Sequence, residues 1–381
     1  MRFDTRLLHD GPPTDPATGG VNPPIVLSST FAQSAPNRNK GYVYSRSGNP
    51  TRAQLEALLA RLEGGHTGLA FSSGLGALAT LLEHFPTGSR IVAGDDLYGG
   101  TWRLLEHHRR QFGIVPVYVD TRDTRLVAHE LARAPTAMLY LETPSNPLLR
   151  LADIAALSRA AHARRAIVAV DNTFATPALQ RPLELGADVV LHSTTKYLGG
   201  HSDIIGGALI ARRRALGARL AWLQNAVGAV PSPVDCFLVV RGIRTLGVRM
   251  RQHEIGARAV AETLARSPKV RSVHYPGLAS EPQRSLARRQ MSGGGGMLSA
   301  DLRGGQKAAL RFLRALRVFT LAESLGGVES LIDHPASMTH ASVPRAEREA
   351  HGVGDGLLRF SCGIEDAADL VEDVAGALRR V

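Results

Sequence analysis

Between residues 69 and 210, short runs of apolar residues alternate with stretches whose apolar residues recur at helical spacing. Runs that are apolar throughout fit strands covered on both faces, and the stretches between them fit the helical crossovers that parallel strands need. The pattern therefore predicts an α/β fold with a mostly parallel sheet. The expected strands are 69–72, 91–94, 115–119, 138–141, 167–170, 189–191 and 208–210.

The chain is expected to fall into three segments. Residues 1–50 are rich in Gly, Pro, Asn and Ser without periodicity and predict an extended arm with turns. Residues 51–234 hold the parallel sheet, beginning with a helix that Thr51 is expected to cap and that stops at Gly64. Residues 235–381 predict a smaller α+β domain. Its expected elements are helices near 235–267, 306–316 and 366–381 and strands at 270–275, 296–302, 319–323 and 357–362.

Length and composition exclude several classes of protein. With 381 residues, 44% of them hydrophobic, the chain can bury a large core. No stretch approaches about 18 uninterrupted apolar residues, so no membrane span is predicted. The first residues do not resemble a secretory signal. Cys236 and Cys362 are the two cysteines, which favours a reducing cytoplasm and predicts neither a disulfide framework nor a metal site.

The net charge of +11 raises the question of a nucleic-acid partner. A nucleic-acid-binding protein concentrates its basic residues on one face. Here the arginines are spread along the chain, with short clusters at 109–110, 164–165 and 212–214 beside expected helix ends or turns. We interpret them as a solvated surface and predict no binding to nucleic acid. Salt-dependent DNA binding would favour the alternative.

A glycine-rich turn follows the first expected strand of the sheet. Gly74 to Ala79 fits the G-x-G-x-x-A pattern, and Asp95 and Asp96 follow about 20 residues later, as in dinucleotide-binding proteins. The pattern alone would favour an NAD enzyme. In a chain rich in Gly and Ala it indicates only a strand–turn–helix whose backbone N–H groups can hold a phosphate.

Two later residues carry the chemistry. Asp171 ends one expected strand, where an acid points into the ligand crevice of a parallel sheet, and Lys196 follows the next strand among hydroxyls and glycines. Pyridoxal phosphate needs such a pair: a lysine that carries the aldehyde and a carboxylate that keeps the ring nitrogen protonated. Tyr98 is the candidate aromatic cover for the ring. An NAD enzyme would leave the pair unexplained.

Across nearly its whole length the sequence resembles the Cys/Met-metabolism pyridoxal phosphate enzymes, which include cystathionine γ-lyase, cystathionine γ-synthase and cystathionine β-lyase. The resemblance implies fold type I, with a mostly parallel sheet in the large domain and a smaller α+β C-terminal domain. Seven motifs in order carry it: 44–51 (YSRSGNPT), 72–74 (SSG), 98–101 (YGGT), 142–147 (ETPSNP), 171–173 (DNT), 193–197 (STTKY) and 324–327 (SLGG).

The resemblance implies roles around the cofactor. Lys196 would hold it as a Schiff base and shuttle protons, with Tyr98 as a second proton mover. Asp171 would pair with the pyridine nitrogen, and Thr173 would lie near the ring. The phosphate would be held by the backbone of two residues and the hydroxyls of two others: Gly74, Leu75, Ser193 and Thr195.

The family also implies an assembly. Tyr44 and Arg46 match residues that reach the cofactor phosphate of a neighbouring subunit. The resemblance therefore implies active sites shared between subunits and a homotetramer built from two such dimers.

Other matching residues would bind the substrate. Arg359 resembles the arginine that grips the α-carboxylate, assisted by Asn146 and Ser324. A charged arginine in a half-apolar strand needs a partner, and an internal salt bridge would satisfy it as well as a substrate carboxylate. Glu323 and Arg103 match residues of the γ-acting members that meet the distal ammonium and distal carboxylate of cystathionine.

These residues favour γ-elimination of L-cystathionine to L-cysteine, 2-oxobutyrate and ammonia, the cystathionine γ-lyase reaction. Residues 228–236 also resemble the γ-lyases, whereas Gly100 replaces the cysteine typical of methionine γ-lyases. The first alternative is cystathionine γ-synthase, which replaces the acyl group of an O-acylhomoserine by cysteine. Cystathionine β-lyase is the second alternative.

Overall fold

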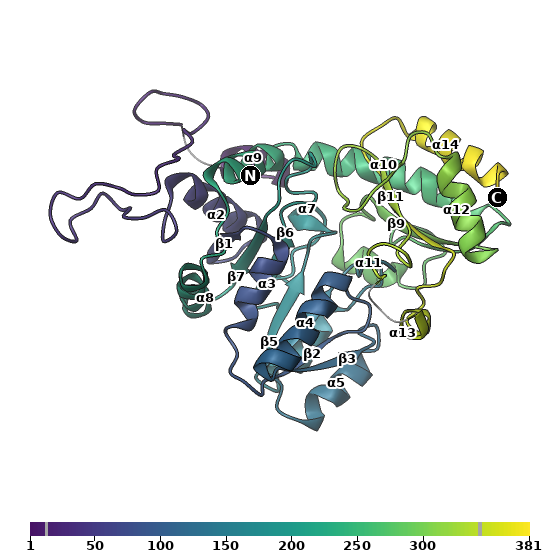
Figure 1. Cartoon of the computed structure of the whole chain (residues 1–381), viewed down its shortest axis with the longest axis horizontal. Coiled ribbons are helices and arrows are strands. Elements are labelled where there is room, and N and C mark those ends of the chain that lie inside the picture. Colours follow the sequence, from purple (N-terminus) through teal and green to yellow (C-terminus); the bar gives the residue numbers. More distant parts are fainter. Residues whose placement is uncertain (12–13, 342–344) are drawn as a thin grey trace.

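The computed structural model describes residues 1–11, 14–341 and 345–381, and within them the chain forms two sheets in succession (Figure 1). The first sheet has the strand order β1-β7-β6-β5-β4-β2-β3. Strands β2 to β6 pair in parallel, while β7 is antiparallel to β1 and β6. The predicted mostly parallel sheet is confirmed. Its strands are β1 Thr67–Phe71, β2 Arg90–Gly94, β3 Val115–Val119, β4 Met138–Glu142, β5 Ile167–Asp171, β6 Val189–Ser193 and β7 Gly207–Ala211.

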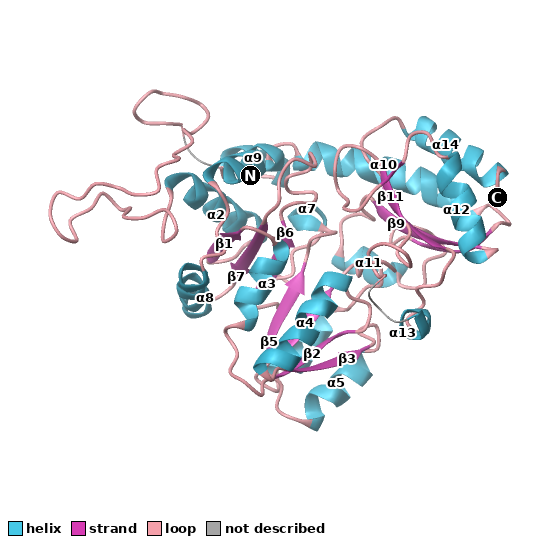
Figure 2. Cartoon of the chain, in the orientation of Figure 1, coloured by secondary structure: helices cyan, strands magenta, loops and turns pink. Residues whose placement is uncertain are grey.

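Helices cover both faces of this sheet (Figure 2), so alternate residues of one strand enter different cores. Leu139 and Leu141 of β4 pack with α2, α5, α6 and α9, whereas Met138 and Tyr140 pack with α3, α4 and α8. This double burial explains why the strands are apolar throughout. These helices are α2 Pro50–Glu63, α3 Gly74–Leu82, α4 Gly99–Phe112, α5 Thr124–Arg133, α6 Ile154–His162, α8 Arg214–Val227 and α9 Pro233–Ile243, and a short α7, Thr176–Leu179, follows β5.

Helix α2 begins earlier than predicted. Asn49, not Thr51, is its N-cap: the Asn49 side chain accepts hydrogen bonds from the backbone N–H groups of Thr51 and Arg52 at 2.9 and 3.2 Å. The Thr51 hydroxyl accepts one from the Val26 N–H instead. The predicted stop is confirmed at Gly64, which takes a left-handed conformation.

The second sheet has the order β10-β11-β12-β9-β8 and a separate apolar core shared with α10, α12 and α14. The predicted helix near 235–267 is two helices, because the chain breaks at Arg244 and Thr245. The three-residue β11 was not predicted. The elements are α10 Leu246–Ala265, β8 Val270–His274, α11 Arg284–Gln290, β9 Met297–Leu302, α12 Gly305–Ala315, β10 Thr320–Leu321, β11 Leu331–Asp333, α13 Arg345–Ala350, β12 Leu357–Ser361 and α14 Ala367–Arg379.

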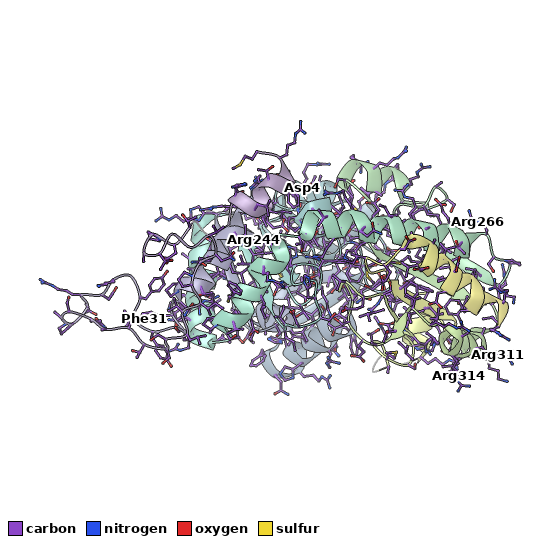
Figure 3. The ribbon with its side chains drawn as sticks, turned by 90° about the horizontal axis from the view of Figure 1, so that it is seen from above. Asp4, Phe31, Arg244, Arg266, Arg311 and Arg314 are labelled. Atoms are coloured by element: carbon purple, nitrogen blue, oxygen red, sulfur yellow. The ribbon has the colours of Figure 1, made fainter. Side chains whose placement is uncertain are left out.

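The N-terminal segment differs from the body of the molecule. It begins with a short helix, α1 Phe3–His9, that buries Leu7, so its first residues are not extended as predicted. Residues 14–49 have almost no regular structure and are mostly exposed. Figure 3 shows Phe31 on this arm, at the opposite end of the molecule from Arg311 and Arg314, which point into solvent.

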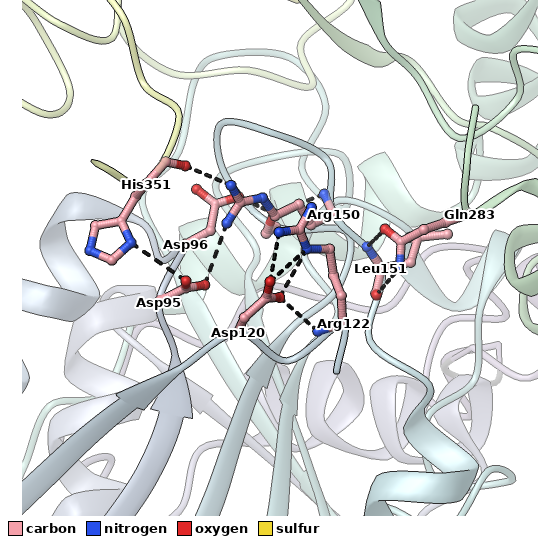
Figure 4. A network of polar contacts seen from close by, with 9 residues as sticks. Asp95, Asp96, Asp120, Arg122, Arg150, Leu151, Gln283 and His351 are labelled. Carbon is pink, nitrogen blue, oxygen red and sulfur yellow. Dashed lines mark hydrogen bonds and ion pairs between the residues drawn. The ribbon is translucent and has the colours of Figure 1, made fainter. Parts of the chain in front are cut away.

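Polar contacts fasten the second part of the chain to the edge of the first sheet (Figure 4). Gln283 exchanges two hydrogen bonds with the backbone of Leu151, at 2.8 and 2.5 Å. Arg150 donates to the backbone carbonyl of His351 at 2.6 Å and pairs with Asp95. Among the described residues, no helix has both the length and the apolar character needed to span a membrane.

Candidate active site

A cavity of about 350 Å³ opens where the carboxyl ends of the parallel strands face the second sheet. Its walls come from both parts of the chain, because residues near 73, 98, 142, 171 and 196 meet residues near 324, 339 and 359. Most of the predicted site residues line it: Gly74, Leu75, Tyr98, Asn146, Asp171, Thr173, Ser193, Thr195, Lys196, Glu323, Ser324 and Arg359.

One end of the cavity is built for an anion. Helix α3 starts there, with Ser73 as its N-cap accepting from the Gly76 N–H at 2.9 Å. The first N–H groups of a helix have no partner within it and favour negative charge. The Ser193 side chain lies close to this turn. A Cβ at position 74 would lie 3.1 Å from Cβ of Ser193, so any residue larger than Gly74 would press against the strand that carries the Ser193 hydroxyl. Thr195, two residues after Ser193, also lines the cavity.

Lys196 follows β6 and is largely enclosed by the cavity walls. Its Nζ donates a 2.6 Å hydrogen bond to the hydroxyl of Ser324. Burial lowers the pKa of the ammonium to about 8, and the positive charge of Arg359 contributes, while Glu323 opposes the shift. The structure thus gives Lys196 a reactive amine near neutral pH.

Asp171 ends β5 at the base of the cavity. Its Oδ1 accepts from the Thr173 N–H at 2.9 Å, yet burial raises the pKa of the carboxyl above its usual range. Behind it lies a fully buried pair, His192 Nε2 and Glu63 Oε1, 2.5 Å apart, and the imidazole acts against the shift. A desolvated carboxylate of this kind is stabilised by a cationic group in the cavity.

Glu142 is a site residue to which the sequence motifs gave no role. It is the cross-strand neighbour of Asp171, and its carboxylate accepts 2.8 Å hydrogen bonds from the Tyr98 N–H and the Thr101 hydroxyl. Burial, reinforced by Asp171, raises the pKa of Glu142 well above its usual range. Glu142 therefore fixes the start of α4 and, with it, the position of Tyr98.

Arg359 lies on β12 with its guanidinium in the cavity wall. Nη1 donates to Asn146 Oδ1 and Nη2 to the carbonyl oxygen of Ser324, each at 3.0 Å. Nη2 also forms an ion pair with the buried Asp333. The internal salt bridge considered from the sequence therefore exists, and Arg359 faces the cavity as well. Asp333 was missed because β11 was missed.

Three predicted site residues lie away from the cavity of their own chain. Tyr44 and Arg46 are on the arm, where Arg46 donates to the carbonyl oxygen of Asn225 at 2.6 Å. Arg103 is exposed on the first turns of α4. Conversely, sequence reasoning missed several residues of the wall whose types carry no chemical signal: Leu78, Tyr140, Phe174, Leu191, Ile205 and Thr339.

The cavity suits pyridoxal phosphate on four counts. Its volume fits a small aromatic ring with a phosphate, and the α3 N-terminus with two hydroxyls suits the phosphate. The Lys196 amine suits the aldehyde, and the desolvated Asp171 carboxylate suits a protonated ring nitrogen. Fold and cavity together define a pyridoxal phosphate-dependent enzyme of fold type I.

Comparisons with known proteins narrow this class. The model of the Cys/Met metabolism PLP-dependent enzyme family matches residues 4–379, and the chain belongs to this family. A cystathionine β-lyase of Coxiella burnetii is 50% identical over 99% of this chain and 97% of its own. A cystathionine γ-synthase of Mycobacterium tuberculosis is 52% identical over 98% and 96%. The crystal structure of a cystathionine γ-lyase from Lactobacillus plantarum superimposes with a TM-score of 0.96 at 44% identity, covering 100% and 99% of the two chains.

Proposed function

We propose that this enzyme is a cystathionine γ-lyase, which converts L-cystathionine and water into L-cysteine, 2-oxobutyrate and ammonia. The observation that supports the choice is Glu323. It lines the same cavity as Lys196 and Arg359, so an acid is available for the distal ammonium of cystathionine while the α-carboxylate is held. Arg103, being exposed, is not part of this support.

In this proposal each residue has a limited task. Arg359 and Asn146 bind and orient the α-carboxylate. Lys196, whose neutral amine is accessible near pH 8, takes protons from the substrate carbons and returns them to the leaving group, and Tyr98, which lines the same cavity, is the second group that moves protons. When bound, the cofactor supplies the electron sink that makes this proton removal feasible. Glu323 holds the distal amine and so sets which sulfur substrates fit.

Cystathionine γ-synthase is the first alternative. The 52% identity to the Mycobacterium tuberculosis γ-synthase favours it, and the 50% identity to the Coxiella burnetii β-lyase keeps the β-elimination open. All three reactions begin with an α-amino acid whose carboxylate binds in the same cavity, cystathionine for the two lyases and an O-acylhomoserine for the synthase, and they differ in the proton transfers that follow.

We also propose a homotetramer of two dimers with shared sites, working in the cytoplasm. The exposed arm supports the dimer, because Tyr44 and Arg46 lie away from their own cavity. The two cysteines are unpaired and buried, which suits a reducing compartment.

Product analysis tests the activity. The purified holoenzyme is incubated with L-cystathionine and, in parallel, with O-succinylhomoserine plus L-cysteine. Cysteine with 2-oxobutyrate from the first reaction supports the γ-lyase. Homocysteine with pyruvate from the first reaction would make the enzyme a β-lyase. Cystathionine from the second reaction, with the first inactive, would make it the γ-synthase.

A further inference from the structure

Asp333 and Arg359 are direct partners across the antiparallel strands β11 and β12, so their side chains lie next to each other. Asp333 is completely buried and Arg359 is 3% exposed. Neither carboxylate oxygen of Asp333 accepts a hydrogen bond from the described residues, so the ion pair with Arg359 is what offsets its charge. A buried carboxylate held by charge alone is costly and has a consequence for the arginine.

The guanidinium is already partly engaged before any substrate arrives. Asn146 and the Ser324 carbonyl occupy one N–H each on Nη1 and Nη2, and Nε has no partner among the described residues. These neutral acceptors orient the group without reducing its charge. Asp333 differs from them because its negative charge acts on the cation that the α-carboxylate of a substrate would need.

We infer that Asp333 moderates the affinity of Arg359 for the α-carboxylate, so that amino-acid substrate and product are held in position but released readily. Arg359 then interacts with two carboxylates at once, that of Asp333 and that of the ligand. The charge of Asp333 lowers the affinity of Arg359 for the ligand carboxylate. Asp333 acts through Arg359 and touches no reacting atom, so it is a positioning residue. The inference rests on the proposed role of Arg359 in substrate binding.

The charges around the pair support this role. Burial has the largest effect on Asp333 and raises the pKa of its carboxyl, whereas the charge of Arg359 lowers that pKa. Smaller effects come from Glu323, which raises the pKa of Asp333, and from His334 and Lys196, which lower it. Asp333 therefore belongs to the same electrostatic group as the amine that receives the substrate. Its charge also raises the pKa of Lys196, after the larger effects of burial, Arg359 and Glu323.

The test compares two ligands that differ only in the carboxylate, L-alanine and L-alaninamide, neither of which carries a leaving group. Their binding to holoenzyme is followed through the visible absorbance of the bound cofactor. The Asp333→Asn variant keeps the shape of the side chain and removes its charge. It should bind L-alanine about tenfold more tightly than the unmodified enzyme does, which is the effect expected when one charge–charge interaction with Arg359 is lost. L-Alaninamide should bind as it does to the unmodified enzyme.

Two further variants make the result decisive. Asp333→Ala is a second uncharged variant in case Asp333→Asn does not fold, and it should also tighten L-alanine selectively, though less, because it leaves a void. Asp301→Asn is the matched control: Asp301 lies on β9, the strand on the other side of β12, forms an ion pair with Arg271 and is not among the residues that line the cavity. It should change the binding of neither ligand.

The outcomes separate this inference from the proposed site. Unchanged or weaker L-alanine binding in both Asp333 variants would overturn the inference. Equal tightening of both ligands would overturn it too, because the effect would then not act on the carboxylate. The proposed role of Arg359 fails only if Arg359→Ala still prefers L-alanine over L-alaninamide as strongly as the unmodified enzyme does.

Discussion

The cavity and the N-terminal arm handle their polar and apolar groups in opposite ways. In the cavity, Lys196 and Arg359 are held by side chains of their own chain, and the carboxylates beside them are desolvated. Along the arm, residues 14–49 are mostly exposed and include apolar side chains such as Val21 and Leu27, which are 75% and 68% exposed.

This contrast shows which contacts hold the cavity and the arm in place. The cavity owes its geometry to contacts inside one chain, so its electrostatics can be derived from that chain. The arm leaves apolar side chains exposed, and exposed apolar side chains are typical of a surface that binds another chain, as the proposed dimer requires. Chemistry is therefore expected to depend on single cavity residues, and occupancy of the cavity to depend on the arm as well.

Removal of the cavity amine should have the largest effect. Lys196→Ala is expected to abolish turnover and the visible absorbance of the bound cofactor, because no other amine lines the cavity among the described residues. The measurements are steady-state turnover and an absorbance spectrum after reconstitution. Retained turnover would contradict the assignment of Lys196.

Removal of the positive charge of Arg46 on the arm should weaken cofactor binding without changing the turnover of sites that hold the cofactor. Arg46→Ala is expected to raise the Kd for the cofactor about tenfold or more, since one charge-assisted phosphate contact is lost. At a cofactor concentration too low to load Arg46→Ala dimers, equal mixing of Arg46→Ala and Lys196→Ala subunits should restore roughly a quarter of the sites, because half of the random dimers are mixed and each has one intact site. Mixtures that gain no sites of the original cofactor affinity after verified subunit exchange would argue against shared sites.

The pH dependence of cofactor loading tests the electrostatics of the cavity. The neutral amine of Lys196 reacts, and burial with Arg359 places its pKa near 8, so the loading rate should rise with pH around a midpoint of about 8. Arg359→Ala removes one of the lowering effects and should move the midpoint to higher pH. A rate that is constant from about pH 7 to 9 would show that this amine does not control loading.

Substitution of Asn49, where the arm joins the body of the molecule, should have the smallest effect. Asn49 caps α2 and also donates to the Val26 carbonyl, so it ties the arm to the body. Asn49→Ala should lower the free energy of unfolding by about 1 kcal/mol, measured by denaturant titration. Asn49→Asp retains the capping acceptor and should cost less; equal losses in both variants would mean that the cap is not the source.

The structural features that could be predicted from the sequence are those that depend on residues close together in the chain. Strands buried on both faces were predicted closely, and β3 was predicted at its observed bounds, because continuous apolar runs are local. The cap at Asn49 was missed because Thr51, two residues later, is also of a type that commonly caps helices. Lys196 and Asp171 could be predicted to share a site, and both line the cavity, because residues of these types are unusual at the ends of buried strands. Asp333 was missed because its meaning depends on the register of β11 against β12, which no local pattern records.

The cavity is closed by contacts between distant parts of the chain, and this has a consequence for folding. Lys196 meets Ser324, 128 residues further on, and Asn146 meets Arg359, 213 residues further on. Such closures form late because long loops must be ordered first. A growing chain that has emerged only through the first sheet thus already carries the amine and the phosphate-binding turn, but not the wall that orients an amino acid. The residues of one subunit that are proposed to hold the cofactor thus come mostly from the first part of the chain, whereas an amino acid can be oriented only once the second part has folded against it.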